Sequence, residues 1–229
     1  MVVAHSVAYR RPLRQDCAVC GAAMVNVTHG GLLAAVPPDG RCCLCRTPIG
    51  PTPGLLEAGA AVVLCLLVPA TPSAWVLAAW SWTALLGIAL AFVDVAVLRL
   101  PDILTVVAGL GSFVLLGAAA VAAGRPGILW QVLAGGVGLG ALYLVPIMSK
   151  TMSMGRGDGM LAVVVGLNVG WLGFAALVTA TMATALIAVA YTVVMLMGRR
   201  IGPADHVPVG PFIMLGALVA VIQHGIAAA

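Results

Sequence analysis

Two aspartates stand out in a chain that is otherwise strongly apolar. Asp94 lies in the stretch AFVDVAVLRLPDILT and Asp158 lies in MGRGDGML, whereas the 229 residues include only seven acidic ones and are 62% hydrophobic. A carboxylate within or beside a membrane segment is costly to bury, so such residues usually belong to a functional site. Two carboxylates at one membrane depth could share a proton and activate water. The pair therefore indicates a membrane aspartic protease.

The residues beside the two aspartates suit a site that admits polypeptide backbone. Gly155 and Gly157 come just before Asp158 and present no side chain that would obstruct an extended substrate. Leu100 and Pro101 follow the first aspartate, and the proline ends the helix there and fixes the turn into the next one. We expect these four residues to shape the active site.

The positions of the aspartates on their helices suggest a division of roles. Asp158 stands where a helix begins, and the helix dipole there favours a negative charge. Asp94 stands near a helix end, where the dipole disfavours one. We therefore expect Asp158 to act as the base and Asp94 as the acid. Taken singly, each aspartate has an equally plausible structural role, Asp158 as a helix cap and Asp94 as a partner for Arg99.

A second group of reactive residues lies in the polar stretch 1–53, which holds five of the six cysteines. Four of them form two CxxC pairs, a spacing that suits one tetrahedral zinc ion held by four thiolates. Cys43 could replace its neighbour as a ligand, and two disulfides are the alternative to zinc. A reducing cytoplasm would disfavour disulfides. The expected zinc ligands are Cys17, Cys20, Cys42 and Cys45.

The elements that must position these residues are membrane helices. A mean hydropathy of +1.15 and a charged fraction of 8% exclude a soluble globular chain. We expect an all-α polytopic membrane protein with about seven transmembrane helices, made of a zinc-binding module (1–53) and a transmembrane aspartic protease domain (54–229). Apolar stretches of nearly bilayer length predict its helices. The expected helices are 55–69, 74–98, 103–123, 128–149, 158–170, 172–197 and 211 to the end.

The basic residues indicate how these helices are oriented. With seven crossings, ten of the eleven basic residues fall on the side of the N-terminal stretch, and only Arg125 falls opposite. The positive-inside rule makes that side cytoplasmic. We therefore expect a multi-pass protein of the inner or plasma membrane with a cytoplasmic N-terminus, whose partner is the lipid bilayer and not nucleic acid. Asp94 and Asp158 would then both lie near the cytoplasmic interface.

Three motifs follow one another along the helical part of the chain. They are DVAVLRLPDILT (94–105), GRGD (155–158) and HVPVGPF (206–212). In this order they resemble the two aspartate motifs and the last-helix segment of type IV prepilin peptidases, a family of Gly-x-Gly-Asp membrane aspartic proteases. The resemblance covers roughly 55–229.

The resemblance implies an endopeptidase that cleaves the leader peptide of type IV prepilin-like precursors at the cytoplasmic membrane face. Asp94 and Asp158 would be its catalytic pair, and its partners would be prepilin-like membrane proteins of a type IV pilus or protein secretion system. Where the family has a lysine after the second aspartate, this chain has Met160. The alternative is a proton- or cation-coupled transporter that uses the two aspartates, but the internal repeats expected of a transporter are not evident.

The stretch 1–53 also resembles part of the family. Bifunctional members carry a cytoplasmic zinc-binding loop with paired CxxC motifs, and this loop is associated with N-methylation that uses S-adenosylmethionine. The resemblance implies a structural zinc, with S-adenosylmethionine as a second cofactor only where methyltransferase activity is retained. No segment within 1–16 could span a bilayer. We therefore expect a variant that lacks the family's first transmembrane helix, which argues against methyl transfer.

Overall fold

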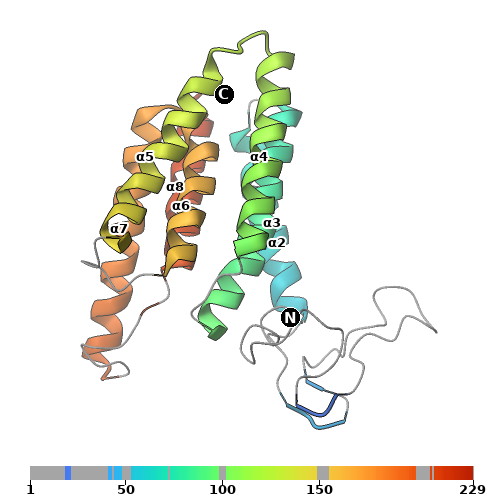
Figure 1. Ribbon diagram of the computed structural model, residues 1–229, viewed down its shortest axis with the longest axis vertical. Coiled ribbons are helices and arrows are strands. Elements are labelled where there is room, and N and C mark those ends of the chain that lie inside the picture. Colours follow the sequence, from blue (N-terminus) through green and yellow to red (C-terminus); the bar gives the residue numbers. More distant parts are fainter. Residues whose placement is uncertain are drawn as a thin grey trace, which may run out of the picture.

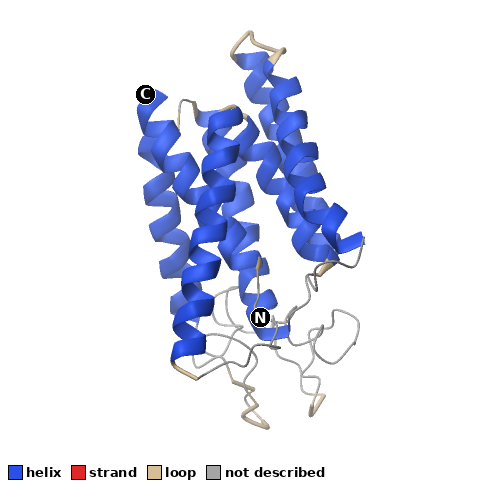
Figure 2. Cartoon of the chain, turned by 90° about the vertical axis from the view of Figure 1, so that its left-hand side faces the viewer, coloured by secondary structure: helices blue, strands red, loops and turns tan. Residues whose placement is uncertain are grey.

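The computed structural model describes residues 19–21, 41–42, 44–47, 53–71, 73–97, 102–148, 155–199, 207 and 209–228. Within these ranges the regular structure is helical (Figures 1 and 2), which confirms the expected all-α class. Each helix lies within two residues of its expected bounds. The helices are α2 (Pro53–Leu67), continued by the 3-10 turn η2 (Val68–Ala70), α3 (Ala74–Val97), α4 (Asp102–Ala122), α5 (Ile128–Met148), α6 (Arg156–Gly170), α7 (Phe174–Met197) and α8 (Gly210–Ala228).

The helices differ in length in a way that matters for the site. Four stretches, in α3, α4, α5 and α7, are long and apolar enough to cross a membrane. The other three helices are apolar but shorter, with 15 residues in α2, 15 in α6 and 19 in α8. Large apolar side chains such as Leu110 and Leu186 remain well exposed on the outside of the bundle, as they do when lipid is the solvent. The chain is therefore a membrane protein.

Neighbouring helices pack as three antiparallel pairs, α3 with α4, α5 with α6, and α7 with α8. Contacts of α6 with α4 and α8, and of α3 with α8, join the pairs into one bundle (Figure 1). Helix α6 is enclosed by the others, since most of its side chains are buried. A helix that is apolar all round is expected at such a central place.

The backbones of α5 and α6 touch at a group of glycines. A Cβ atom added to Gly166 would lie 2.3 Å from the Gly135 carbonyl oxygen, and one added to Gly135 would lie 2.4 Å from the Gly166 oxygen. Small residues allow such close approach between membrane helices, where dispersion contacts replace the hydrophobic effect. This contact fixes the position of α6, which carries Asp158.

The up-and-down order places several helix ends together. The C-terminal end of α3 and the N-terminal ends of α4, α6 and α8 all lie at the lower end of the bundle in Figure 1. The turn between α4 and α5, which contains Arg125, lies at the upper end. The described cysteines lie below the start of α2. Asp94 and Asp158 are therefore at one end of the bundle, the end that also faces the cysteines.

Candidate active site

Asp94 lies near the C-terminal end of α3, beyond the apolar stretch Ala74–Phe92. Its side chain is only 3% exposed. The backbone N–H of Gly210, the first residue of α8, donates a hydrogen bond to its Oδ2 atom at 3.1 Å. The first N–H groups of a helix have no partner within that helix. Asp94 therefore supplies an acceptor to α8 and ties the end of α3 to the start of α8.

Asp158 lies in the first turn of α6 and is 6% exposed. Gly155 precedes the helix with an extended backbone and accepts a hydrogen bond from the Asp158 N–H at 3.1 Å. The Oδ1 atom of Asp158 is buried and has no hydrogen-bond partner among the described residues. A buried carboxylate oxygen without a partner is rare in folded proteins and is often found where a substrate or water binds.

Gly210 brings the two aspartates together. A Cβ atom on this residue would lie 2.9 Å from Oδ2 of Asp94 and 3.6 Å from Oδ1 of Asp158. Both carboxylates thus approach the same small volume beside one glycine, and a larger residue there would intrude between them. Glycine is used where another group must approach the backbone closely. The structure therefore joins the two aspartates, from α3 and α6, at the start of α8.

Two further side chains define the surroundings of Asp158. Tyr143 of α5 is close enough to Asp158 for their side chains to interact electrostatically, and it forms a hydrogen bond with the side chain of Thr184. Met160, in contrast, lines a separate apolar cavity of about 310 Å³ that it shares with residues of α4 and α5, such as Thr105 and Leu133. The side chain at the position of the family lysine therefore faces this cavity.

The remaining residues expected near the aspartates are described only in part. Gly157 is buried at the start of α6, whereas Gly155 is exposed. Leu100 and Pro101 lie outside the described residues, as does His206 of the third motif. Sequence reasoning missed Tyr143 and the direct contact of Gly210, although the third motif marked the segment in which Gly210 lies.

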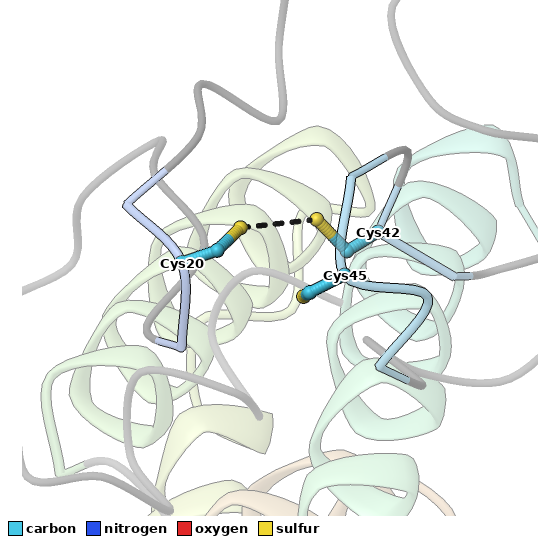
Figure 3. A group of neighbouring side chains, drawn as sticks. All are labelled: Cys20, Cys42 and Cys45. Carbon is cyan, nitrogen blue, oxygen red and sulfur yellow. Dashed lines mark hydrogen bonds between the residues drawn. The ribbon is translucent and has the colours of Figure 1, made fainter.

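The described cysteines form a compact cluster (Figure 3). The Sγ atoms of Cys20, Cys42 and Cys45 all lie within 4.8 Å of one another, and those of Cys20 and Cys42 are 3.6 Å apart. Sulfur ligands of a tetrahedral zinc ion, with Zn–S bonds near 2.3 Å, are about 3.8 Å apart. The three thiols therefore fit one metal ion. Cys17, the expected fourth ligand, and Cys43 lie outside the described residues.

The surroundings of two of these thiols, Cys42 and Cys45, favour their thiolate forms. The Thr47 hydroxyl lies 3.2 Å from the Sγ atom of Cys45. This hydrogen bond, with one from the Thr47 backbone, lowers the pKa of Cys45 to about 6. Backbone hydrogen bonds, first from Cys45 and then from Leu44, also lower the pKa of Cys42. Thiolates are the form that binds metals, so the cluster could hold a metal ion.

Two curated proteins are similar to this chain. They are the proteins named "Prepilin leader peptidase/N-methyltransferase" of Burkholderia pseudomallei strains 1026b and K96243. Each is 32% identical to the chain over 213 residues, an alignment that covers 89% of this chain. The chain is thus similar to proteins named as prepilin leader peptidases. It spans 65% of the length of these two relatives. No family model and no solved structure matches it.

This similarity confirms the resemblance drawn from the three motifs. In this chain the first two motifs supply the two buried carboxylates, and the third supplies the glycine between them. The motifs are far apart in the sequence, with Asp94 and Gly210 separated by 116 positions. The fold brings all three to one end of the bundle.

Proposed function

We propose that this chain is a membrane-embedded aspartic endopeptidase that cleaves the leader peptide of type IV prepilin-like precursors at the cytoplasmic membrane face. The observation that carries this proposal is the placement of two buried carboxylates, Asp94 and Asp158, within 3.6 Å of one point beside Gly210. Two adjacent carboxylates that share a proton can activate water without a metal or a nucleophilic side chain. The names of the two relatives support the same activity.

The proposed reaction uses the two carboxylates in complementary states. The ionised carboxylate takes a proton from water as the water oxygen adds to the scissile carbonyl carbon, and the protonated one hydrogen-bonds to the carbonyl oxygen. The carbon–nitrogen bond then breaks as the amine receives a proton. The N–H of Gly210 stabilises negative charge on Asp94. This favours Asp94 as the base and Asp158 as the acid, the opposite of the assignment from the helix dipoles alone.

An apolar cavity beside the aspartates supports a substrate with a hydrophobic segment. The cavity has a volume of about 470 Å³ and lies between α2, α3, α6 and α8. Neither aspartate lines it, but its wall includes Phe92, two residues before Asp94 on α3, and Pro211, the residue after Gly210. A precursor with a membrane-spanning segment next to its leader could place that segment here and the leader outside the bilayer. Prepilin-like membrane proteins of a type IV pilus or secretion system are therefore the proposed partners.

The distribution of charge supports a cytoplasmic site in the inner or plasma membrane. Arg46, near the cysteines, and Arg199, after α7, are exposed at the end of the bundle that carries the aspartates. Arg125 is exposed at the opposite end. A cytoplasmic excess of basic residues is typical of membrane proteins. We propose a multi-pass arrangement with the N-terminus in the cytoplasm.

The cysteine cluster supports a division of the chain into a zinc-binding module (1–53) and a transmembrane protease domain (54–229). Zinc would have a structural role, held by Cys20, Cys42 and Cys45 with Cys17 as the fourth ligand. The relatives' name also includes N-methyltransferase. Methyl transfer would need S-adenosylmethionine, and the described residues offer it no separate support, so the proposal for this chain is the peptidase.

The decisive test is cleavage of a prepilin-like precursor co-expressed with the wild-type chain, Asp94→Asn or Asp158→Asn. Each substitution removes one proton-transfer group, so we expect the cleavage rate to fall on the order of a thousandfold. The released leader and the shortened precursor are measured by mass spectrometry. Glu57→Gln, at an exposed position of α2, is the matched control and should cleave normally. Normal cleavage by both aspartate variants would refute the proposal.

A further inference from the structure

The cavity beside the aspartates extends far into the membrane part of the bundle. On α3 its wall runs from Phe92 back to Trp80, which corresponds to about 18 Å along the helix axis. On α8 it continues from Pro211 to Val221. Most of the wall is apolar. The exceptions lie at the deep end, where the wall includes the polar residues Trp80, Thr83 and Asn168.

The polar residues at this deep end belong to a buried network that joins three helices. The hydroxyl groups of Thr83 in α3 and Ser112 in α4 are hydrogen-bonded to each other. The Nδ2 atom of Asn168 in α6 donates to Ser112 Oγ at 3.2 Å and to the Val164 carbonyl oxygen at 2.8 Å. A carbonyl oxygen can only accept, so the bond to Val164 fixes which end of the Asn168 amide is the nitrogen.

Two atoms at this end of the cavity are left without partners. The Oδ1 atom of Asn168 and the Nε1 atom of Trp80 are buried and have no hydrogen-bond partner among the described residues. The two side chains are 5% and 3% exposed, and both line the cavity. A buried polar group without a partner costs free energy, and within a bilayer lipid tails supply none. The two side chains thus bring one unpaired acceptor and one unpaired donor to the wall of the cavity.

The chemistry of these two atoms selects the group that can bind. An ammonium group has only donors and would leave Trp80 unpaired, while a carboxylate has only acceptors and would face the Asn168 oxygen. A hydroxyl or a carboxamide has both a donor and an acceptor. We propose that the deep end of the cavity is a binding site for one neutral hydroxyl or amide side chain in the membrane segment of the substrate.

The distance from the aspartates gives the position of that side chain. Asn168 follows Asp158 on α6 by about ten residues, or roughly 15 Å along the axis. A helical substrate segment of the same length would join the scissile bond to the polar site. The site therefore prefers substrates with serine, threonine, asparagine or glutamine about ten residues beyond the cleavage point. This inference rests on the proposed peptidase function, because only a cleaved substrate has its position set by the aspartates.

The test uses model precursors with one basic leader and a membrane segment of leucine and alanine. A single asparagine replaces leucine at each of positions 4 to 16 after the cleavage point, and kcat and KM are measured with the full-length protein in lipid nanodiscs. We expect KM to be lowest, by about tenfold, for asparagine near position ten, with little change in kcat. Lysine or glutamate at that position should give no such gain. Equal KM values at all positions would overturn the inference and would indicate that water, not a substrate side chain, occupies the deep end of the cavity.

Trp80→Phe removes the N–H donor and keeps the aromatic ring. It should reduce the tenfold preference to about threefold or less, whereas Trp82→Phe, on the lipid-exposed side of α3, should keep it. An unchanged preference in Trp80→Phe would contradict the site. If this variant does not fold, the position scan with the wild-type protein decides alone. A chain that cleaves no precursor at all refutes the proposed function, whereas aspartate-dependent cleavage without positional preference refutes only this inference.

Discussion

The aspartate site and the cysteine cluster both gather side chains from distant segments, but different forces hold them. The aspartates stand on α3 and α6, which pack against α8, and a hydrogen bond from Gly210 fixes Asp94. The described cysteines stand on short turns, where the hydrogen bonds between Cys42 and the segment that follows it are local. Helix packing can therefore form the first site, whereas the second rests on local turns that a bound metal could hold together.

The sharpest way to test this contrast is to disturb the aspartate site without changing either carboxylate. Gly210→Ala places a Cβ 2.9 Å from Asp94 Oδ2. Shifting a catalytic group by about 1 Å can cost on the order of a hundredfold in rate, so we expect a loss of that size in kcat with the melting temperature nearly unchanged. Gly117→Ala on α4, where a Cβ meets nothing within 4 Å, should cleave normally. Wild-type kcat in Gly210→Ala would show that the glycine does not position the pair.

The next test weakens the packing beneath the aspartate site. Gly166→Ala forces a methyl group against the Gly135 backbone at 2.3 Å. Overpacking of this kind costs about 1–3 kcal/mol, so the free energy of unfolding in detergent should fall by that amount while zinc content stays constant. The matched change Gly138→Ala, on α5 with open space around it, should leave stability within about 0.5 kcal/mol of wild type. Equal stability of the two variants would contradict the close backbone contact.

The smallest effect on cleavage is expected from a substitution in the cysteine cluster. Cys42→Ser removes a thiolate, so zinc affinity should fall by on the order of a hundredfold or more. Cleavage should change by less than about tenfold, since effects at well-separated sites are largely independent. Zinc content and cleavage rate are measured on the same purified protein. The control Cys65→Ser, at an exposed position of α2, should keep both. A loss of cleavage as complete as in Asp94→Asn would make the cluster part of the catalytic machinery.

The sequence predicts the helices well because their ends are marked by proline, glycine and charge. It also predicts that Asp94 and Asp158 share one end of the bundle, since this follows from counting the crossings. The three described cysteines cluster as the CxxC spacing predicts. These features depend on local chemistry or on chain direction alone.

Contacts between helices could not be predicted in the same way. The hydrogen bond from Gly210 to Asp94 joins segments 116 positions apart. Neither segment has a sequence feature that identifies the other as its partner. Apart from Asp158 and Asn168, helix α6 has apolar residues on every side, so its pattern does not show which face meets which neighbour. Met160 illustrates the difficulty, because residues two apart on a helix do not face each other. Its closeness to Asp158 in sequence therefore did not place its side chain beside the carboxylates.

The short helices have a consequence for the bilayer itself. Helices α2 and α6, with 15 residues each, are about 22 Å long, whereas the hydrocarbon layer of a membrane is about 30 Å thick. Helix α6 is enclosed by the other helices, but most of α2 is exposed or half-buried, and lipid beside α2 would thin locally to match so short a helix. Since α2 lines the cavity together with α3, α6 and α8, the bilayer would be thin on the side of the bundle that carries the cavity. The protein would then bring the aqueous phase down to its carboxylates by deforming the bilayer.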